Sequence, residues 1–416
     1  MRVTSGNFLE MYDFFLFGLY ASHIAAAFFP RQDEFAALMS VFLTFAGGFL
    51  MRPLGAVFLG AYVDSVGPRK GLIVTLAIMA VGTLLICIVP GYRTIGVLAP
   101  TLVVAGRLLQ GFSAGVELGG VSVYLAEIAP PHQKGFMVSW QSASQQAAIV
   151  FAAALGYGLS LVLNKEQMAD FGWRIPFALG CCLVPFLFYI RASLQDTPGF
   201  RSRKHHPRLR QVWASILGNW PVVICGMFMV ALTTTAFYLI TVYTPTYAKN
   251  VLQLSESTSL IVTCCIGASN FFWLPFFGRL SDRVGRRPIL LLFATLAVFT
   301  AYPALKWMVS APGIGRLLAV ELWLSLLFGG YNGAMVPALT EIMPRELRTT
   351  GFSVAYSLAT ALFGGCTAAI STWLIETTHN KASPGLWISC VAILAVGAVL
   401  ILGQRFEGRQ TVAIAN

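Results

Sequence analysis

An arginine and a glutamate lie inside one apolar stretch of the chain, where they could bind an anion or carry a proton. The stretch covers residues 97–125 and contains Arg107 and Glu117. In a helix, Arg107, Gln110 and Glu117 would form one stripe. A charge at the centre of a bilayer costs about 3 kcal/mol, so such residues usually face a bundle interior or a water-filled cavity. The pattern indicates a substrate or ion path; the alternative is a buried Arg–Glu pair that only ties helices together.

The first apolar segment holds a second candidate for proton transfer. A single helix would place Glu10, Asp13, Phe17 and Tyr20 on one face. Asp13 is the deeper of the two acids, and we expect it to carry a coupling proton, with Tyr20 on the same face as a substrate contact. The alternative for Asp13 is a structural acid that accepts hydrogen bonds. Glu10 lies nearer the interface, where a gate or packing role is expected.

Other polar residues in apolar segments are candidates for substrate contacts. Arg52 could bind a carboxylate or pair with Asp13 or Glu117. An amide or hydroxyl inside a membrane helix needs a partner, which substrate, water or another helix can supply, although a threonine can also bond back to its own helix. The remaining candidates are Gln145 in the fifth segment, Thr235 and Tyr238 in the seventh, and Tyr331 and Asn332 in the tenth.

The composition places these residues in a membrane protein. Of 416 residues, 57% are hydrophobic and only 11% are charged, with a mean hydropathy of +0.73, whereas soluble domains carry about 25% charged residues. The eight cysteines show no metal-ligand spacing. At ~20 residues per span, the sequence predicts an all-α integral membrane protein with twelve transmembrane helices, at about 6–29, 36–63, 71–90, 97–126, 136–163, 174–190, 216–248, 258–280, 289–310, 316–341, 352–376 and 386–403.

Loop charge predicts the orientation and argues against nucleic-acid binding. The net charge is +11, but the cations lie in short loops and do not gather on a polar domain. Alternate loops are rich in Lys and Arg, so this side is cytoplasmic by the positive-inside rule and both termini lie there. The longest basic loop divides the chain into residues 1–190, a linker at 191–215, and residues 216–416.

Two motifs occur once in each half. Gly60, Asp64 and Gly67 before Arg69 and Lys70 correspond to Gly278, Asp282 and Gly285 before Arg286 and Arg287, and the stretches at 127–130 and 341–344 also correspond. This register predicts two pseudo-symmetric six-helix halves. In the same register Glu321 aligns with Arg107, and Tyr331 with Glu117, so the halves differ in charge at this level and the anion site is expected to lean towards the first half.

The motifs resemble those of the major facilitator superfamily over nearly the whole chain. The G-x-x-x-D-x-x-G-x-[RK]-[RK] loops carry the resemblance, and GNFLEMYDFFLFG, MRPLGAVFLG, GRLLQGFSAGVELGG and WQSASQQ are similar to its metabolite:proton symporter branch. TTTAFYLITVYTPTY, YNGAMVPALTEIMP and WRIPF look most like its citrate and tricarballylate symporters. The first loop departs from the pattern, since Ser65 and Pro68 stand where the family usually has arginine. The resemblance implies a bacterial inner-membrane location, and a cytoplasmic gate formed by Asp64, Asp282 and Arg286. Arg348, at the start of the eleventh span, could be a gate residue or a ligand.

The sequence therefore predicts a secondary transporter that imports citrate or tricarballylate with protons by alternating access. A dianion entering against 100 mV would cost about 4.6 kcal/mol, from ~2.3 per charge, and co-transported protons offset this. Arg107 and Arg52 would hold the anion, and Asp13 or Glu117 would carry protons; sodium could replace them. Alternatives are a carrier of a dicarboxylate or of a zwitterion such as betaine or proline, or a sensor that does not transport. No nucleophile–base pair, metal set or phosphate loop indicates an enzyme or a cofactor.

Overall fold

The structure is a computed structural model that describes residues 2–29, 34–66, 68–115, 122, 125–126, 129–130, 132–192, 218–343 and 348–403. All regular secondary structure in these ranges is helical. Several residues for which the sequence predicts a role lie outside the described part of the chain. They are Glu117, most of the linker, and the side chains of Glu10, Asp64 and Arg348.

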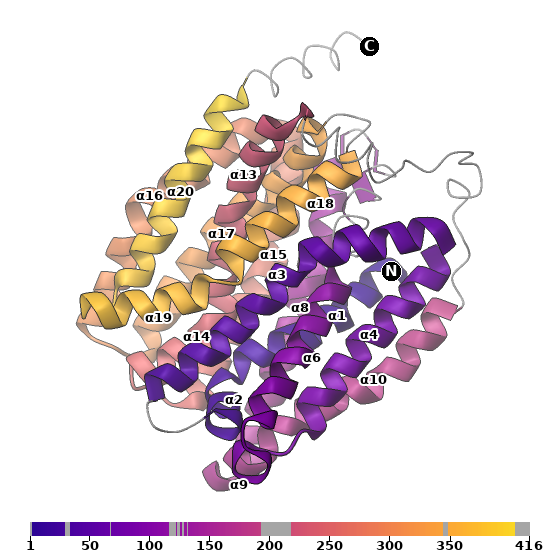
Figure 1. The fold of residues 1–416 in the computed structure, drawn as a ribbon. Helices are drawn as coiled ribbons and strands as arrows, with labels where there is room; N and C mark the ends of the chain where they lie inside the picture. Colours follow the sequence, from indigo (N-terminus) through magenta and orange to yellow (C-terminus); the bar gives the residue numbers. More distant parts are fainter. Residues whose placement is uncertain are drawn as a thin grey trace.

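Apolar runs of the first half form the helices coloured from indigo (α1) to pink (α10) in Figure 1, and those of the second half form the helices coloured from dark rose (α13) to yellow (α20) beside them. The first half contains α1(Arg2–Leu19), α2(Ala21–Phe28), α3(Glu34–Val66), α4(Pro68–Ile88), α5(Tyr92–Ile95), α6(Leu98–Ala114), α8(Lys134–Val162), α9(Lys165–Asp170), the 3₁₀ turn η1(Gly172–Arg174) and α10(Ile175–Ala192). The second contains α13(Trp220–Tyr238), η2(Leu239–Tyr243), α14(Thr244–Thr246), η3(Tyr247–Val251), α15(Glu256–Val284), α16(Arg286–Ser310), α17(Ile314–Ile342), α18(Arg348–Ala359), η5(Thr360–Gly364), α19(Thr367–Thr378) and α20(Ser383–Ile401).

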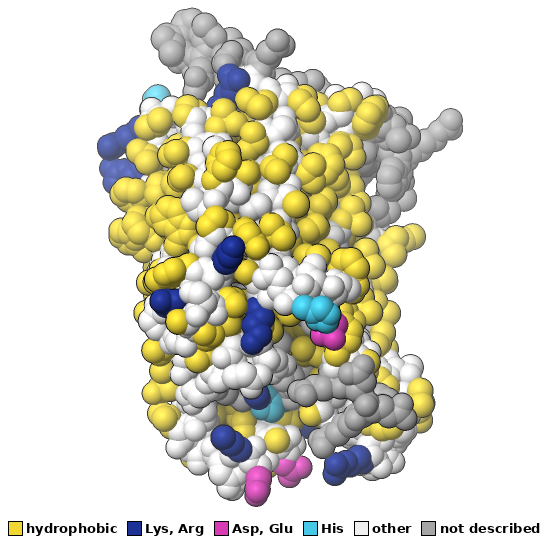
Figure 2. All heavy atoms as spheres, turned by 90° about the vertical axis from the view of Figure 1, so that its left-hand side faces the viewer, with side chains coloured by type: hydrophobic (Ala, Val, Ile, Leu, Met, Phe, Trp, Pro, Cys, Tyr) yellow, Lys and Arg dark blue, Asp and Glu magenta, His cyan; other side chains and the backbone are white. Residues whose placement is uncertain are grey.

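The helices are long and apolar enough to cross a bilayer. Among the described residues, eight helices have this length and hydropathy, and the bent pair α1–α2 would be a ninth. The shorter α4, α6 and α10 occupy the other three predicted positions. Large hydrophobic side chains such as Phe58 and Phe299 are 64% and 71% exposed, and Figure 2 shows hydrophobic side chains covering a broad band of one face. Lipid would cover this band, and the twelve-helix prediction is confirmed.

The first span differs from the continuous helix that the sequence predicted. α1 ends at Leu19, and α2 turns away from it by 69°. Tyr20 lies at the break, with φ −103° and ψ 21°, and its N–H still donates to the Leu16 carbonyl at 3.0 Å. The expected single helix is wrong, because the helix direction changes after this residue and the 100° periodicity holds only within an unbroken helix.

The seventh span is also irregular. Two π-helical segments, η2 and η3, flank the single turn α14, in which Pro245 follows Thr244. Pro245 has no N–H to donate, and π segments are rare and frequently lie at functional sites. A Cβ at Gly18 would lie 2.0 Å from Cγ1 of Val242 in η2, so a glycine is needed where α1 crosses this segment.

Glycines bring α3 and α6 into backbone contact. A Cβ at Gly111 would lie 1.7 Å from the carbonyl oxygen of Gly48, and a Cβ at Gly55 would lie 1.9 Å from that of Phe112. Such small residues allow membrane helices to approach closely. The crossing places Arg52 of α3 and Arg107 of α6 side by side in the interior, where both are at most 2% exposed.

The two halves meet along α8 and α15. At one end, which we call the Asp282 end, a Cβ at Gly278 would lie 2.6 Å from the carbonyl oxygen of Gly135. At the opposite end, which we call the Ser160 end, the hydroxyls of Ser160 and Ser257 lie 3.2 Å apart. Between these ends, the amide of Asn270 donates to Gln146 at 3.1 Å. The halves are thus in contact at both ends of the bundle.

Replacing Gly111 by alanine should weaken the α3–α6 crossing. The new methyl group would overlap a backbone carbonyl, and overpacking of this kind costs about 1–3 kcal/mol. We expect a lower Tm for Gly111→Ala in thermal unfolding of the detergent-solubilised protein. Gly158→Ala is the control, because nothing lies within 4 Å of that position; equal Tm values for the two variants would contradict the close packing.

Candidate functional site

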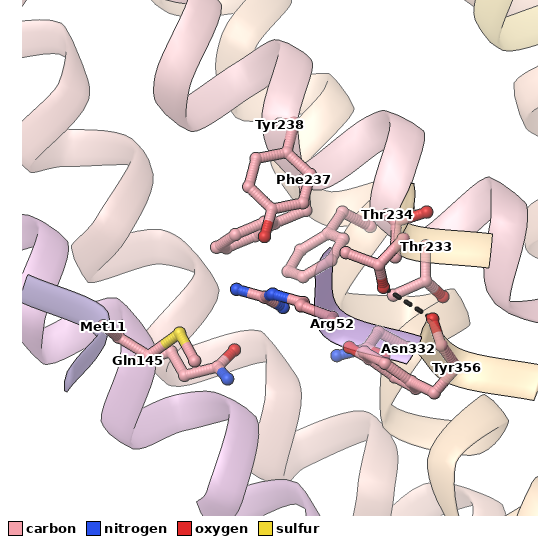
Figure 3. A pocket seen from close by; sticks show the side chains of 11 residues that line it. Met11, Arg52, Gln145, Thr233, Thr234, Phe237, Tyr238, Asn332 and Tyr356 are labelled. Atoms are coloured by element: carbon pink, nitrogen blue, oxygen red, sulfur yellow. Dashed lines mark hydrogen bonds between the residues drawn. The ribbon is translucent and has the colours of Figure 1, made fainter. Parts of the chain in front are cut away.

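A small cavity lies between the two halves, at about the middle of the bundle. Its volume is about 20 Å³, room for about one water molecule. Met11, Arg52 and Gln145 of the first half line one side. Figure 3 shows these side chains facing the second half, whose lining residues are Thr233, Thr234, Phe237, Tyr238, Phe328, Asn332, Tyr356 and Thr360.

Arg52 is the charged side chain of this cavity wall. It is 2% exposed, and Nε and Nη2 of its guanidinium have no hydrogen-bond partner among the described residues. Its central carbon lies 4.5 Å from the ring centroid of Phe14 and 4.4 Å from that of Phe49. The Tyr238 hydroxyl points towards the guanidinium from the second half (Figure 3). Two donors on a planar fork, aimed into a cavity, form an arrangement that suits a carboxylate.

Arg107 lies behind this wall and does not line the cavity. It is 0% exposed, and its guanidinium is 4.1, 4.5 and 5.0 Å from the ring centroids of Phe14, Phe17 and Phe45. The sequence identified Arg107 as the main anion ligand, whereas the structure places Arg52 at the cavity. The reason is tertiary: α1 places Phe14 and Phe17 over Arg107, and α3 adds Phe45. The ring faces supply cation–π contacts worth about 2 kcal/mol or more when desolvated.

A chain of hydrogen bonds connects Arg107 to Asp13. Arg107 Nη1 donates to Gln110 Oε1 at 2.7 Å, and Gln110 Nε2 donates to the Thr83 hydroxyl at 2.9 Å. That hydroxyl donates to Oδ2 of Asp13 at 2.5 Å. Every donor points from the cation towards the acid, so each bond polarises the next. Asp13 and Arg107 are therefore coupled without direct contact.

The other oxygen of Asp13 lies against α10. A Cβ at Gly180 would lie 2.2 Å from Oδ1, and this oxygen has no hydrogen-bond partner among the described residues. Asp13 is 3% exposed and is absent from the cavity lining. A direct Asp13–Arg52 ion pair, one of the alternatives from the sequence, is not among the described ion pairs.

Three predicted substrate contacts lie away from the cavity. Tyr20 packs at the α1–α2 break, where its hydroxyl would lie 2.7 Å from a Cβ at Gly156 of α8. The Tyr331 hydroxyl donates to the carbonyl of Met229 at 3.0 Å, so it ties α17 to α13. Thr235 is fully buried but absent from the lining. The prediction that these three side chains line the substrate site does not agree with their positions, because helical spacing cannot tell which face of a helix meets the other half.

Gln145, Tyr238 and Asn332 do line the cavity as predicted. The prediction from the sequence missed two polar lining residues. Tyr356 and Thr360 come from the eleventh span. Their sequence signal is a polar stripe, since Ser353, Tyr356 and Thr360 fall at i, i+3 and i+7 of one helix. The hydroxyl-rich wall thus comes from α13 and from the α18–η5 segment.

The predicted gate residues of the second loop lie at the Asp282 end. Asp282 accepts hydrogen bonds from the backbone N–H groups of Gly135 and Phe136 at 2.8 and 3.0 Å. These groups begin α8, so a carboxylate of the second half caps a helix of the first. Arg286 holds the carboxylate at 2.7 Å and also contacts Glu341 at 3.2 Å. We call this set of contacts the Asp282 cap.

The family is shown by a comparison with protein-family models. The model described as Major Facilitator Superfamily matches residues 3–368. The chain belongs to this superfamily. The relatives named below are transporters. The described residues contain no cluster of three or more His, Cys, Asp or Glu that could hold a metal ion.

Curated relatives cover almost the whole of this superfamily member. A protein from Klebsiella pneumoniae named citrate-proton symporter is 61% identical over 97% of this chain and 91% of its own. A protein of the same name from Salmonella typhi is 58% identical over 98% and 94%. A proline/betaine transporter of Escherichia coli K12 is 31% identical over 94% and 80%.

Solved structures confirm the major facilitator fold. The D-xylose-proton symporter superposes with a TM-score of 0.76 over 96% of this chain and 95% of its own, at 19% identity. A partially occluded, inward-open form of the Escherichia coli xylose transporter gives 0.76 over 97% and 96%, at 18% identity. At such identities the likeness concerns the fold.

Removing the Thr83 hydroxyl should break the chain between Arg107 and Asp13. Thr83→Val keeps the shape but leaves a buried carboxylate and a buried amide each without a partner, which costs about 1–3 kcal/mol per group. We expect a lower Tm in detergent. Thr235→Val is the matched control, since its hydroxyl has no partner among the described residues. A Tm that falls equally in both variants would show that the chain contributes nothing.

Proposed function

We propose that this chain imports citrate together with protons by alternating access. Two citrate-proton symporters at 61% and 58% identity support the substrate and the coupling ion. The observation that carries the proposal is Arg52, a buried cation with two unpartnered donors on the wall of the central cavity. The polar wall of the second half faces it (Figure 3).

In this mechanism a carboxylate of citrate binds to Arg52. The carboxylate would accept from the unpartnered guanidinium nitrogens and would compensate the excess positive charge that Arg52 and Arg107 create around Phe14. Tyr238, Asn332 and the α13 residues Thr233 and Thr234 would receive the remaining carboxylates and the hydroxyl. Because the cavity holds about one water molecule, helices must move apart before citrate enters.

Asp13 would carry a coupling proton. In its ionised form it accepts from Thr83 and orients the chain that ends at Arg107. A proton on Asp13 would remove the negative charge that polarises this chain, and Arg107 would then be held mainly by its aromatic contacts. The Gln110 amide does not pass protons readily, so the chain would transmit polarisation rather than a proton. Glu117 stays a prediction, since it lies outside the described residues.

The Asp282 cap would close the cytoplasmic side. The loops at this end carry most of the Lys and Arg, which supports a cytoplasmic position for it and for both termini. The cap joins a carboxylate of one half to a helix N-terminus of the other. Rocking the halves apart around the central site would break it, as alternating access requires. Asp64 and Arg348 would complete the gate.

Tricarballylate is a finer alternative for the same site. It lacks the hydroxyl of citrate, so competition between the two measures how much that hydroxyl contributes. A dicarboxylate would use the same arginine. Betaine or proline, carried by relatives at about 31% identity, would place a cationic end near two arginines. A sensor would bind citrate without accumulating it in sealed vesicles.

Uptake into proteoliposomes tests the proposal. We expect an inward proton gradient to drive accumulation of labelled citrate by the wild type, with tricarballylate as competitor and with sodium-free buffer as the test of the coupling ion. Arg52→Gln should raise the KM for citrate by about tenfold to a hundredfold, because hydrogen bonds to charged groups contribute about 1.5–3 kcal/mol.

Arg93→Gln is the control for this experiment, since Arg93 is exposed outside the cavity. Arg52→Lys should give an intermediate KM, because lysine keeps the charge but loses the fork. Wild-type protein that folds but accumulates no citrate would refute the proposed substrate. A KM unchanged in Arg52→Gln would remove Arg52 from the site.

Neutralising Asp282 should open the cytoplasmic side. Asp282→Asn removes the charge from the Asp282 cap, which we expect to weaken closure by about 1–3 kcal/mol. The measurement is maleimide labelling of a single cysteine at Ser139, which is 2% exposed, in a protein whose native cysteines are replaced. The rate should rise several-fold. Asp170→Asn, an exposed residue of α9, is the control and should label at the original rate.

A further inference from the structure

A second carboxylate is buried in the C-terminal half, and the proposed mechanism does not use it. Glu321 lies two turns into α17 and is 4% exposed. It lines a cavity of about 10 Å³, which is separate from the central one. The sequence register places Glu321 opposite Arg107, but its surroundings resemble those of Asp13: a single hydroxyl donor and one free oxygen.

The contacts of Glu321 are few and almost entirely neutral. Oε1 accepts from the Thr244 hydroxyl at 2.9 Å. Oε2 has no hydrogen-bond partner among the described residues, and Glu321 takes part in none of the ion pairs formed by them. An ionised carboxylate in this position lacks a counter-charge, whereas a protonated carboxyl carries none and needs no cation.

The titratable neighbours of Glu321 are two tyrosines that are bonded elsewhere. Tyr243 and Tyr247 line the same cavity. The Tyr247 hydroxyl donates to the Lys381 carbonyl at 2.7 Å, and that of Tyr243 accepts from Thr372 at 3.2 Å. The residues that α16 and α20 contribute to the lining are Leu305, Met308 and Pro384. Glu321 is thus the only acid or base of this lining that can exchange a proton at neutral pH.

The donor to Glu321 sits in the irregular part of the seventh span. Thr244 begins α14, between the π segments η2 and η3. The η2 residue Val242 presses against Gly18 of α1, so this segment links the cavity of Glu321 to the first half. A change of charge on Glu321 alters the strength of its bond to Thr244, and through it the hold on a segment that contacts the other half.

We propose that Glu321 binds and releases one of the co-transported protons, as a second proton site beside Asp13. This inference rests on the proposed function. In each cycle the carboxylate would take one proton from the side on which citrate enters and return it on the other side, so that one proton crosses per citrate at this residue. Protonation of Glu321 would change the strength of its hydrogen bond to Thr244, and this would affect how η2 packs against α1.

The test is the number of protons taken up per citrate in proteoliposomes. Citrate is followed by radiolabel and protons by alkalinisation of a weakly buffered medium. Glu321→Gln, which imitates the protonated acid, should retain citrate counterflow and move one proton fewer per citrate than the wild type. Glu376→Gln, an exposed acid of α19, is the matched control and should keep the wild-type ratio. An unchanged ratio in Glu321→Gln would overturn the inference and leave the proposed function standing.

A second measurement works without transport. Infrared difference spectra between alkaline and acidic buffer should contain the carbonyl band of a protonated carboxyl that is missing in Glu321→Gln. In Thr244→Val this band should move to higher frequency, because the carboxyl loses its hydrogen bond, and uptake should remain active to a pH about one unit higher. Spectra that are identical in all three proteins would overturn the second proton site, even if citrate proves not to be the substrate.

Discussion

Two guanidinium groups in an apolar interior set the constraint on which the described site depends. Arg52 and Arg107 both lie over the ring of Phe14. Among the described residues, Asp13 is joined to Arg107 through hydrogen bonds of Thr83 and Gln110 and not by an ion pair. Ring faces compensate a cation less than an ion pair does, so positive charge remains beside the cavity. The glycine contacts of α3 and α6 enforce this arrangement, because they hold the two arginines together. The packing of these helices therefore leaves a positive charge beside the cavity that would attract an anion.

Much of the fold could be predicted because its signals are local. Apolar length and the alternation of loop cations predicted twelve spans, and charges within spans identified Asp13, Arg52 and Arg107 as interior residues. Which arginine reaches the cavity could not be predicted, because the answer depends on where α1 places Phe14 and Phe17 and where α3 places Phe45. Likewise, the spacing that put Tyr20 on the same face as Asp13 assumed one continuous helix, whereas α1 ends at Leu19. The sequence contains no proline signal for this break, because the first proline of the chain is Pro30.

The second half illustrates the same division between local and tertiary information. The sequence placed Thr235 and Tyr238 of the seventh span among the substrate contacts, and the cavity is lined by Tyr238 with Thr233 and Thr234 but not by Thr235. Tyr331 is equally polar but bonds within its own half. Thr244 is the most instructive case: it belongs to the same hydroxyl-rich run, yet the π segments around it turn it towards Glu321. Irregular turns redirect side chains that regular spacing would place elsewhere, and sequence periodicity does not anticipate them.

The small size of the central cavity has an electrical consequence. The halves are in contact at the Asp282 end and at the Ser160 end, and the cavity between them has room for about one water molecule. The described residues therefore leave little space for a file of water across the bundle. The voltage of the membrane then falls across packed side chains instead of along a conducting path. We expect this conformation to act as an insulator in a membrane and to hold steep ion gradients between transport cycles.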